Sequence, residues 1–411
     1  MEALGESLQI PESHNGVPDL IDETAYELDW LAKAVLNTKE GTLPFFLRPA
    51  SGGYEQGAPP EGQPKRVFFT VTKGPNRAET LFAAGALAMG ARSPLFKKYL
   101  PARCALYRKA ALRAFAGYLA HAADKSYWKD FGWYDTDAKP HKWSDEMLVA
   151  AANLFSLTGD AKYLEYVRAE LPPDLKKSRR WGWLADVPSL LAFVTLARTA
   201  DPRLDPAIAR AAREAVIDFA DASLGHDNRR YEAPFGAPLP WTINQRVGWY
   251  FTGSANAWPL MIGYAFTHEA RYLEQLTADW NWLLGTNPLS RTFVSGLGDP
   301  EHRPRWPVNE IAQVEWAKWQ AGDKSGWVEI QPGFLSADVQ GGAYSWFLKD
   351  AHNAARRDEK FPAQDANYPA LYRYHDSWTV EDEATIERLA RSAVSVLPLV
   401  QLQRPPVRTS P

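Results

Sequence analysis

Helical periodicity recurs along the whole chain, and it limits the possible folds more than any other feature of the sequence. Residues 18–37 begin with proline at the first helical position and carry apolar residues at helical spacing. That stripe consists of Ile21, Ala25, Leu28, Ala32 and Val35. Similar stripes predict nine further helices, over residues 78–92, 102–124, 145–157, 161–170, 188–199, 205–223, 255–267, 269–284 and 383–400. Residues 66–72, R-V-F-F-T-V-T, are the one segment that reads as a strand, so the pattern predicts an all-α protein.

The connections between the predicted helices are either short or long. Tight turns at residues 158–160 and 199–203 predict antiparallel helical hairpins. Long segments rich in Pro, Gly and Trp lie between the hairpins, at residues 43–76, 125–143, 226–250 and 286–380. Loops of that length in a compact domain usually carry function. We therefore predict a single domain over residues 1–411, a ring of helical hairpins in which residues 286–380 form a long loop region of the substrate face.

Composition excludes several classes of partner and site. The 46 basic and 49 acidic residues give a net charge of -3 without a long block of one sign, which argues against a nucleic-acid partner. The sequence lacks a run of about 18 apolar residues, so no membrane partner is predicted, and its first residues do not resemble a secretory signal. Cys104 is the single cysteine and lies in an Ala-rich helical pattern, which predicts a buried thiol. The eight histidines show no metal-ligand spacing, so no zinc site is predicted.

Tryptophan is more frequent than a core normally requires. The chain has 17 Trp, and aromatic residues make up 13% of it. Many of the tryptophans lie in predicted loops, at Trp128, Trp133, Trp143, Trp241, Trp306 and Trp327. Aromatic side chains in irregular loops usually line a binding surface. The pattern therefore predicts an aromatic binding face.

A cluster of acids lies in residues 374–386, Y-H-D-S-W-T-V-E-D-E-A-T-I. It places Asp376, Glu381, Asp382 and Glu383 beside Trp378. A pair of carboxyl groups can cleave a glycosidic bond, since one protonates the leaving oxygen while the other activates water or attacks the ring. The same acids also suit the first turn of the helix predicted over residues 383–400, where Asp and Glu are good caps. The residues alone leave sugar chemistry and helix capping both open.

Four segments of the chain carry a more specific signal. They are I-P-E-S-H-N-G-V-P-D-L-I-D-E at residues 10–23, W-S-D-E-M-L-V-A-A-A-N-L-F-S-L-T-G-D at residues 143–160, W-L-L-G-T-N-P-L-S-R-T-F-V-S-G-L-G at residues 282–298, and D-S-W-T-V-E-D-E-A-T-I at residues 376–386. In this order they resemble glycoside hydrolase family 9, the cellulase family built on an (α/α)6 barrel. The resemblance covers nearly the whole chain, and four long matches in order are far more specific than any single motif.

The resemblance implies hydrolysis of a β-1,4-linked glucan, polymer or oligosaccharide, with inversion at the anomeric carbon and without a required cofactor. Glu383 would be the general acid, with Glu381 as the fallback because this chain has one extra residue in the motif. Asp376 would support the acid, and Tyr372 and Trp378 would contact the sugar. Nearby carboxylates would raise the pKa of Glu383 by like-charge repulsion, as a general acid requires.

The first departure from the family concerns the catalytic base. The family places a D-A-G-D-Y motif upstream of the segment that matches residues 10–23, and only nine residues precede Ile10 here. We therefore expect a barrel that lacks its first helix and base, with impaired activity, closed by a missing segment or a partner chain. Residues 132–143, G-W-Y-D-T-D-A-K-P-H-K-W, offer Asp135 and Asp137 as replacement bases. The simpler interpretation is a loop whose Trp133 and Trp143 bind substrate.

The second departure lies in residues 298–306, G-D-P-E-H-R-P-R-W, where the family has a P-H-H-R-like cluster that contacts sugar. Hydrogen-bond donors remain in His302, Arg303 and Arg305, and Trp306 follows them. Together with Trp241 these residues complete the predicted substrate contacts. A changed pattern here fits either a different sugar, such as glucosamine, or drift in a surface loop.

Some family members bind calcium beside the S-D-E helix. The matching positions are Asp145, Glu146 and Asp186, and oxygen ligands of this kind suit calcium. A helix cap with an exposed acid is the alternative interpretation. For the chain as a whole, the main alternative is a carbohydrate-binding protein that keeps the aromatic cleft without hydrolysis. The resemblance implies that the parent protein is secreted or periplasmic.

Overall fold

The computed structural model describes residues 14–49, 68–129, 144–175, 186–225 and 253–286, together with Thr292, Val294, Leu297, Gly298, Val396 and Leu399. The chain divides into two compact units, and each is considered by itself. The first unit holds the described elements up to Phe219, and the second holds those from Ala220 onward. The single-domain organisation over residues 1–411 stays a prediction.

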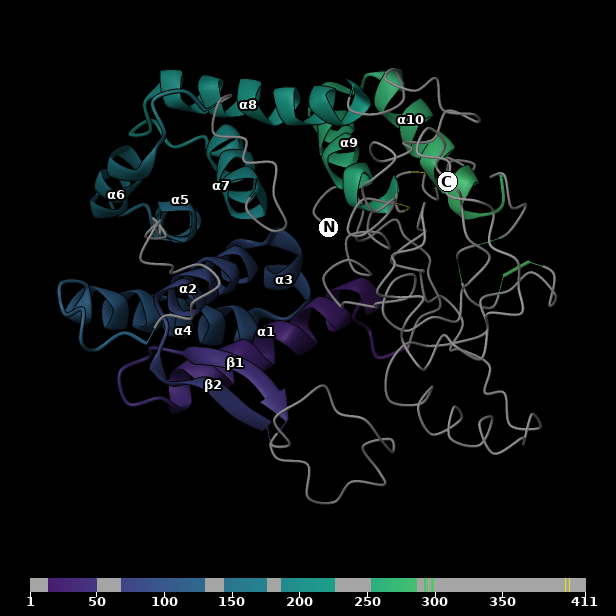
Figure 1. Ribbon diagram of the computed structural model, residues 1–411. Helices are drawn as coiled ribbons and strands as arrows, with labels where there is room; N and C mark the ends of the chain where they lie inside the picture. The colour runs from purple at the N-terminus through teal and green to yellow at the C-terminus, as the bar shows by residue number, and fades with distance from the viewer. Residues whose placement is uncertain are drawn as a thin grey trace, which may run out of the picture. The chain divides into compact units, whose positions relative to one another are not determined.

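The described elements are mainly helices (Figure 1). They are α1 Asp19–Asn37, α2 Arg77–Arg92, α3 Pro94–Tyr99, α4 Pro101–His121, α5 Ser144–Thr158, α6 Lys162–Glu170, α7 Asp186–Arg198, α8 Pro206–Gly225, α9 Gly253–Thr267 and α10 Ala270–Leu283. The strands are β1 Pro44–Pro49 and β2 Phe68–Pro75. Nine of the predicted helices are confirmed, with ends that differ by no more than three residues. Of the helix predicted over residues 383–400, the structure describes only Val396 and Leu399, both helical.

Helix α1 forms as its periodicity predicts. The stripe Ile21, Ala25, Leu28, Ala32 and Val35 is buried, and α1 packs through it against α4 and α2. The acids Asp19 and Asp22 lie in its first turn, where the helix dipole favours negative charge. On another face, Tyr26 is 74% exposed and Trp30 is 51% exposed. The buried stripe therefore fixes which side of α1 faces the core of the first unit.

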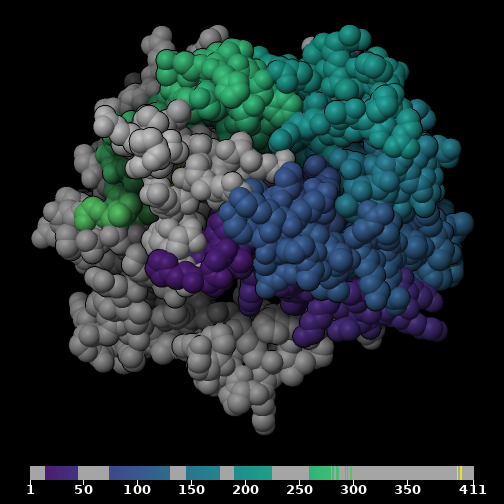
Figure 2. All heavy atoms as spheres, turned by 180° about the vertical axis from the view of Figure 1, so that it is seen from behind, coloured from purple at the N-terminus to yellow at the C-terminus, as the bar shows by residue number. Residues whose placement is uncertain are grey.

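Small residues let α2 approach its neighbours closely. A Cβ atom added to Gly85 would lie 2.6 Å from Cγ1 of Val149 on α5, and one added to Gly90 would meet the side chains of Leu28 and Tyr107. Helix α2 packs against α4 on one side and α5 on another. The side chains of the first unit, purple to blue-green in Figure 2, lie in continuous contact. The Ala and Gly content of α2 thus suits a central helix in this unit.

Helices α2 and α5 run in the same direction, and α7 joins them through Thr195. Near its end, α2 places Arg92 so that Nε donates to Oδ1 of Asn153 at 3.0 Å on α5 and Nη2 donates to Oγ1 of Thr195 at 3.3 Å on α7. Asn153 and Thr195 are both almost fully buried and lie in the second half of their helices. Gly85 in the middle of α2 meets Val149 in the first half of α5. Because these two contacts advance together, the N-termini of α2 and α5 lie on one side of the first unit.

Two elements were not expected from the sequence. Residues 43–76 were predicted as a long loop with a strand at 66–72, but β1 pairs antiparallel with β2, with Pro44 opposite Pro75 and Pro49 opposite Phe68. Prolines bound β1 at both ends, and Pro normally signals a loop, although it is tolerated at strand ends. Helix α3 is only six residues long, too short to show periodicity, and Ser93 caps it before Pro94.

The second unit contains an antiparallel hairpin of α9 and α10 that packs on the end of α8. Its buried cluster consists of Ala220, Leu260 and Tyr272. Gly263 on α9 allows that helix to approach α8 closely, because an added Cβ would lie 2.5 Å from Cβ of Ala220. Across the ranges that the structure describes, no helix has the length and hydropathy needed to span a bilayer. In the first unit, Cys104 is buried as predicted, and burial raises the pKa of its thiol.

Candidate active site

Acidic residues begin helices α2, α5 and α7. Glu79 lies in the first turn of α2, Asp145 and Glu146 lie in the first turn of α5, and Asp186 is the first residue of α7. The long connections of the first unit enter these same N-termini, while the α5–α6 hairpin closes at the other end through Gly159, whose φ is +67°. The acids of α2 and α5 therefore lie on the side of the long connections, which the sequence predicts as the substrate face.

Glu79 is half-buried and has the most unusual carboxyl among the described residues. Burial, and secondarily the negative charge of Glu146, raise its pKa to about 7. Its backbone N–H donates to Oδ1 of Asn76 at 3.1 Å, so Asn76 is the N-cap of α2. A carboxyl group with a pKa near neutrality can both give and accept a proton at physiological pH. The sequence reasoning missed Glu79, although a lone acid in the run R-A-E-T-L-F-A-A-G-A-L-A-M-G-A-R was a usable signal.

Two consecutive acids in the first turn of α5 each lie near an acid of a different helix. The negative charge of Glu146 contributes to the raised pKa of Glu79 on α2, while the charge of Asp145 contributes to the raised pKa of Glu170 at the end of α6. The pKa of Glu170 is raised, first by burial and then by the charge of Asp145. Two consecutive residues thus bring negative charge to two different neighbouring helices. Keeping these carboxyls together disfavours ionisation of the more buried member of each pair.

The predicted calcium ligands are described only in part. Asp145 and Glu146 are half-buried on α5, and for Asp186 the structure describes the backbone alone. Among the side chains that the structure describes, no group of three or more His, Cys, Asp or Glu is arranged to hold a metal ion. The two adjacent acids supply oxygen ligands of the right chemistry but not a complete set. The calcium site stays a proposal.

Two loop segments support the first turn of α2. The backbone N–H of Asn76 donates to the carbonyl of Leu43 at 2.7 Å, and the N–H of Leu43 donates to Oγ1 of Thr80 at 2.9 Å. On the other side, the N–H of Lys129 donates to the carbonyl of Pro75 at 2.7 Å. The start of α2 is therefore held by residues that follow α1 and by residues that follow α4.

Trp128 corrects one expectation about the loop tryptophans. It was predicted to lie on a binding face, but only 4% of its surface is exposed. Its Nε1 donates to the carbonyl of His121 at 2.8 Å, and its ring packs against Tyr118 and Tyr127. The guanidinium of Arg77 lies over the same ring, 5.5 Å from the centroid. Trp128 is buried against the C-terminal end of α4, because its indole N–H donates to the carbonyl of His121 there.

The other predicted site residues lie outside the described residues. They are the acids Asp135, Asp137, Asp376, Glu381 and Glu383, and the substrate contacts Trp133, Trp143, Trp241, His302, Arg303, Arg305, Trp306, Tyr372 and Trp378. Their roles stay predictions. The structure brings together Glu79, Glu146, Asp145 and Glu170 instead, and of these only Asp145 and Glu146 were predicted.

Comparison with known proteins gives a consistent result. The family model described as glycosyl hydrolase family 9 matches residues 4–376. Endoglucanase D of Acetivibrio thermocellus is 23% identical over 357 residues, which cover 83% of this chain and 53% of that protein. A xyloglucan-specific endo-β-1,4-glucanase of Bacteroides ovatus is 25% identical over 325 residues, covering 72% of this chain and 50% of that protein.

Solved structures show the same fold. A crystal structure of the family 9 endoglucanase J30 has a TM-score of 0.64 and 25% sequence identity, covering 96% of this chain and 66% of that one. Such neighbours have an (α/α)6 barrel, which confirms the predicted fold class. The chain spans about half the length of the curated relatives named above.

Proposed function

The chain belongs to glycosyl hydrolase family 9, and from this membership we propose that it forms part of an enzyme that hydrolyses β-1,4-linked glucan. The observation that carries the proposal is the family match over residues 4–376, which includes most of the helical fold. The relatives named as endoglucanases support a cellulose-type polymer or its oligosaccharides as substrate. Since such polymers do not cross membranes, we also propose that the parent protein acts outside the cell.

The proposed mechanism is inversion, with two carboxyl groups on opposite sides of the glycosidic bond. Glu383 protonates the leaving oxygen, and Asp376 and Glu381 are its neighbours in sequence. A carboxylate opposite the acid activates the water that attacks the anomeric carbon. Asp135 and Asp137 are the candidates for that base within this chain.

The described part of the molecule adds one further candidate for proton transfer. Glu79 has a pKa of about 7, which matches the requirement of a general acid or base near neutral pH. Phe82, three residues later on the same face of α2, keeps 37% of its surface exposed. A carboxyl group beside an exposed aromatic ring suits a sugar, because the ring can cover the apolar face of a pyranose while the carboxyl binds hydroxyls. Both residues lie at the end of α2 where the long connections enter.

Partners beyond the substrate follow from the exposed face of α1. Tyr26 and Trp30 lie one turn apart there, and both are largely exposed. Large exposed aromatic side chains next to each other commonly mark an interaction surface. We propose that a further segment or another chain packs on this face and completes the barrel.

The function is tested by assaying the purified protein on a panel of soluble polymers. Carboxymethyl cellulose, mixed-linkage β-glucan, xyloglucan and chitosan distinguish the sugar, and a reducing-sugar assay measures turnover. Inversion is read from the anomer that NMR detects first. Binding of cello-oligosaccharides by calorimetry without any turnover would instead support the carbohydrate-binding alternative. Absence of both binding and turnover on all four polymers would contradict the proposal.

A further inference from the structure

Residues 14–17 form an exposed bend directly before α1. Two residues with positive φ flank Asn15, His14 at +60° and Gly16 at +84°. The Asn15 side chain turns back on its own backbone, because Oδ1 accepts from the N–H of Val17 at 2.8 Å. The carbonyl end of this amide is therefore held within the bend.

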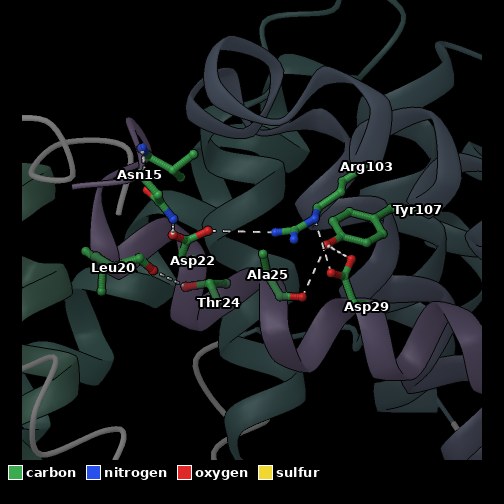
Figure 3. A network of polar contacts seen from close by, with 9 residues as sticks. Asn15, Leu20, Asp22, Thr24, Ala25, Asp29, Arg103 and Tyr107 are labelled. Atoms are coloured by element: carbon green, nitrogen blue, oxygen red, sulfur yellow. Dashed lines mark hydrogen bonds and ion pairs between the residues drawn. The ribbon is translucent and has the colours of Figure 1, made fainter. Parts of the chain in front are cut away.

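The nitrogen end of the same amide binds α1 (Figure 3). Nδ2 of Asn15 donates to Oδ2 of Asp22 at 2.5 Å. The other oxygen of Asp22 lies 3.8 Å from Nη1 of Arg103 on α4, and Nε of Arg103 lies 3.1 Å from Asp29. Asn15 thus links the segment before α1 to a polar group that joins α1 to α4.

Asn15 is the one asparagine in the sequence that a glycine follows. The peptide nitrogen after an asparagine can attack the side-chain carbonyl carbon and close a five-membered ring, and glycine favours this reaction because it lacks a side chain to shield that nitrogen. Space around Gly16 is open, since a Cβ added there would meet nothing within 4 Å. Solvent base can therefore reach the Gly16 N–H, which must lose its proton before the nitrogen attacks.

The hydrogen bonds of the amide suit this reaction. Negative charge develops on Oδ1 of Asn15 as the ring closes. The Val17 N–H already donates to that atom, in the way that a preorganised donor stabilises an oxyanion in an enzyme. Asp22 holds the leaving nitrogen on the opposite side of the amide. The two contacts fix which end of the amide faces the bend and which end faces α1.

We propose that Asn15 is a site of spontaneous deamidation in the folded protein, and that the product releases the segment before α1 from Asp22. The bond between the Gly16 nitrogen and Cγ of Asn15 forms, and the bond from Cγ to Nδ2 breaks. The proton lost by the Gly16 nitrogen is replaced on Nδ2 through solvent, so ammonia leaves. Water then opens the succinimide at either carbonyl and gives aspartate or isoaspartate at position 15. Water is the only co-reactant.

Either product changes the contact with α1. The N–H that donates to Asp22 is replaced by a carboxylate, and two carboxylates at the spacing of the present hydrogen bond repel each other. Asp19 adds negative charge in the same turn of α1, while Arg103 is already shared between Asp22 and Asp29. Isoaspartate also lengthens the main chain by one atom, which breaks the geometry of the bond to Val17. The bend should therefore separate from the start of α1.

The reaction is measured on the intact protein, without substrate, so its outcome is independent of the proposed function. The protein is kept for days in mildly alkaline buffer, peptide mapping by mass spectrometry follows the conversion of amide to carboxyl, and an isoaspartyl methyltransferase assay reports the isoaspartate. Asn37, exposed at the end of α1 and followed by the β-branched Thr38, is the internal control. Asn15 is expected to react about tenfold faster or more, a difference that a modest lowering of the barrier produces. Equal rates at the two asparagines, or reaction of Asn15 only after unfolding in urea, would overturn the proposal.

Variants separate the reaction from its consequence. Asn15→Gln keeps an amide but would have to close a six-membered ring, so no product should form at that position. Gly16→Ala has room for its Cβ but is strained at this φ and shields the nitrogen, so the reaction should slow. Product at an unchanged rate in both variants would refute the ring-closure route.

Asn15→Asp reproduces the aspartate product from the start. Hydrogen–deuterium exchange in residues 17–22 should rise about two- to fivefold in this variant at one fixed pH, the range expected when an exposed polar contact is lost. Residues 162–170 of α6 are the internal reference and should not change. Unchanged exchange in residues 17–22 would show that the product does not release the segment before α1.

Discussion

The hydroxyl of Tyr107 on α4 donates a hydrogen bond to Oδ1 of Asp29 on α1 at 2.6 Å (Figure 3). The tyrosine side chain is fully buried, and Nε of Arg103 binds the other oxygen of Asp29 at 3.1 Å. Burial and the charge of Asp29 raise the pKa of Tyr107, so the phenol stays protonated and keeps donating. The contact ties two helices whose paired residues lie 78 positions apart.

The second unit repeats this arrangement. Tyr272 on α10 is fully buried and donates to Oδ1 of Asp221 on α8 at 2.7 Å. Nη2 of Arg271 lies 2.7 Å from the same Asp221 oxygen. A buried Tyr that donates to an Asp held by an Arg is thus used twice to join one helix to another.

The first prediction concerns the Tyr107 hydroxyl. Tyr107→Phe removes one hydrogen bond to a charged acceptor and should lower the free energy of unfolding by about 1–3 kcal/mol. Urea denaturation followed by circular dichroism measures the change. Tyr26→Phe, on the exposed face of α1, is the matched control and should shift it by less than about 0.5 kcal/mol. Equal effects of the two substitutions would show that the buried hydrogen bond contributes nothing.

The second prediction concerns the buried polar group between α2, α5 and α7. Thr195→Val keeps the shape of the side chain but removes the hydroxyl that accepts from Arg92. The same hydroxyl donates to Oδ1 of the buried Asn153, and each hydrogen bond lost contributes about 0.5–1.5 kcal/mol, so the midpoint of thermal unfolding should fall. Thr277→Val on the exposed side of α10 removes a hydroxyl that binds only the carbonyl four residues earlier, so it serves as the control. A similar midpoint for both variants would contradict the assignment.

The third prediction tests the packing of α4 against the segment after α1. A Cβ added to Gly117 would lie 3.1 Å from Cγ2 of Thr42 and even closer to the carbonyl oxygen of Glu40, which is backbone and cannot rotate away. Gly117→Ala should therefore destabilise the protein by about 1–3 kcal/mol, as overpacking does. At a helical position with open space around it, Gly→Ala stabilises the protein. A fall in stability therefore indicates close packing at Gly117, and a rise indicates open space. A rise in thermal stability would show that the two segments can separate without cost.

The fourth prediction follows from the raised pKa of Glu79. Its pKa rises from 4.5 to about 7 on folding, so the folded state binds the proton more tightly. Stability from this group is complete below its ordinary pKa and is lost as the pH rises towards 7. Glu79→Gln cannot ionise and should be more stable than the parent at pH 8, by about 1–3 kcal/mol, while the two converge near pH 4. Glu27→Gln on the exposed side of α1 should show no such divergence, and parallel curves for Glu79→Gln would refute the assignment.

The fifth prediction concerns the proposed general acid. Glu383→Gln should lower kcat on β-glucan about 10²- to 10⁴-fold while leaving the binding of cello-oligosaccharides within a small factor. Substrates with an activated leaving group should recover part of the rate, since they need less protonation. Glu381→Gln distinguishes the two carboxyls of the motif. If Glu381→Gln shows the larger loss, the acid is the fallback residue.

Local pattern was sufficient for the helices and for the position of two acids at the start of one of them. The stripe from Ile21 to Val35 predicted which face of α1 is buried, because helical spacing alone puts those residues on one side. Asp145 and Glu146 were placed correctly at the start of α5 by the S-D-E motif. Strand β1 was missed, since its pairing partner β2 lies beyond a long connection and its bounding prolines resemble loop residues.

The sequence by itself determined the helical class, the helix bounds and the family, because periodicity, turn residues and ordered motifs are local properties of the chain. Only the tertiary structure decided that Glu79 is buried and lies near Glu146, 67 positions later, so that its pKa rises to about 7. It also decided that Trp128 is buried rather than exposed, and that His121 reaches Glu40. Burial and charge proximity depend on which helices pack together, and no local pattern in one segment specifies the side chains that another segment brings to it.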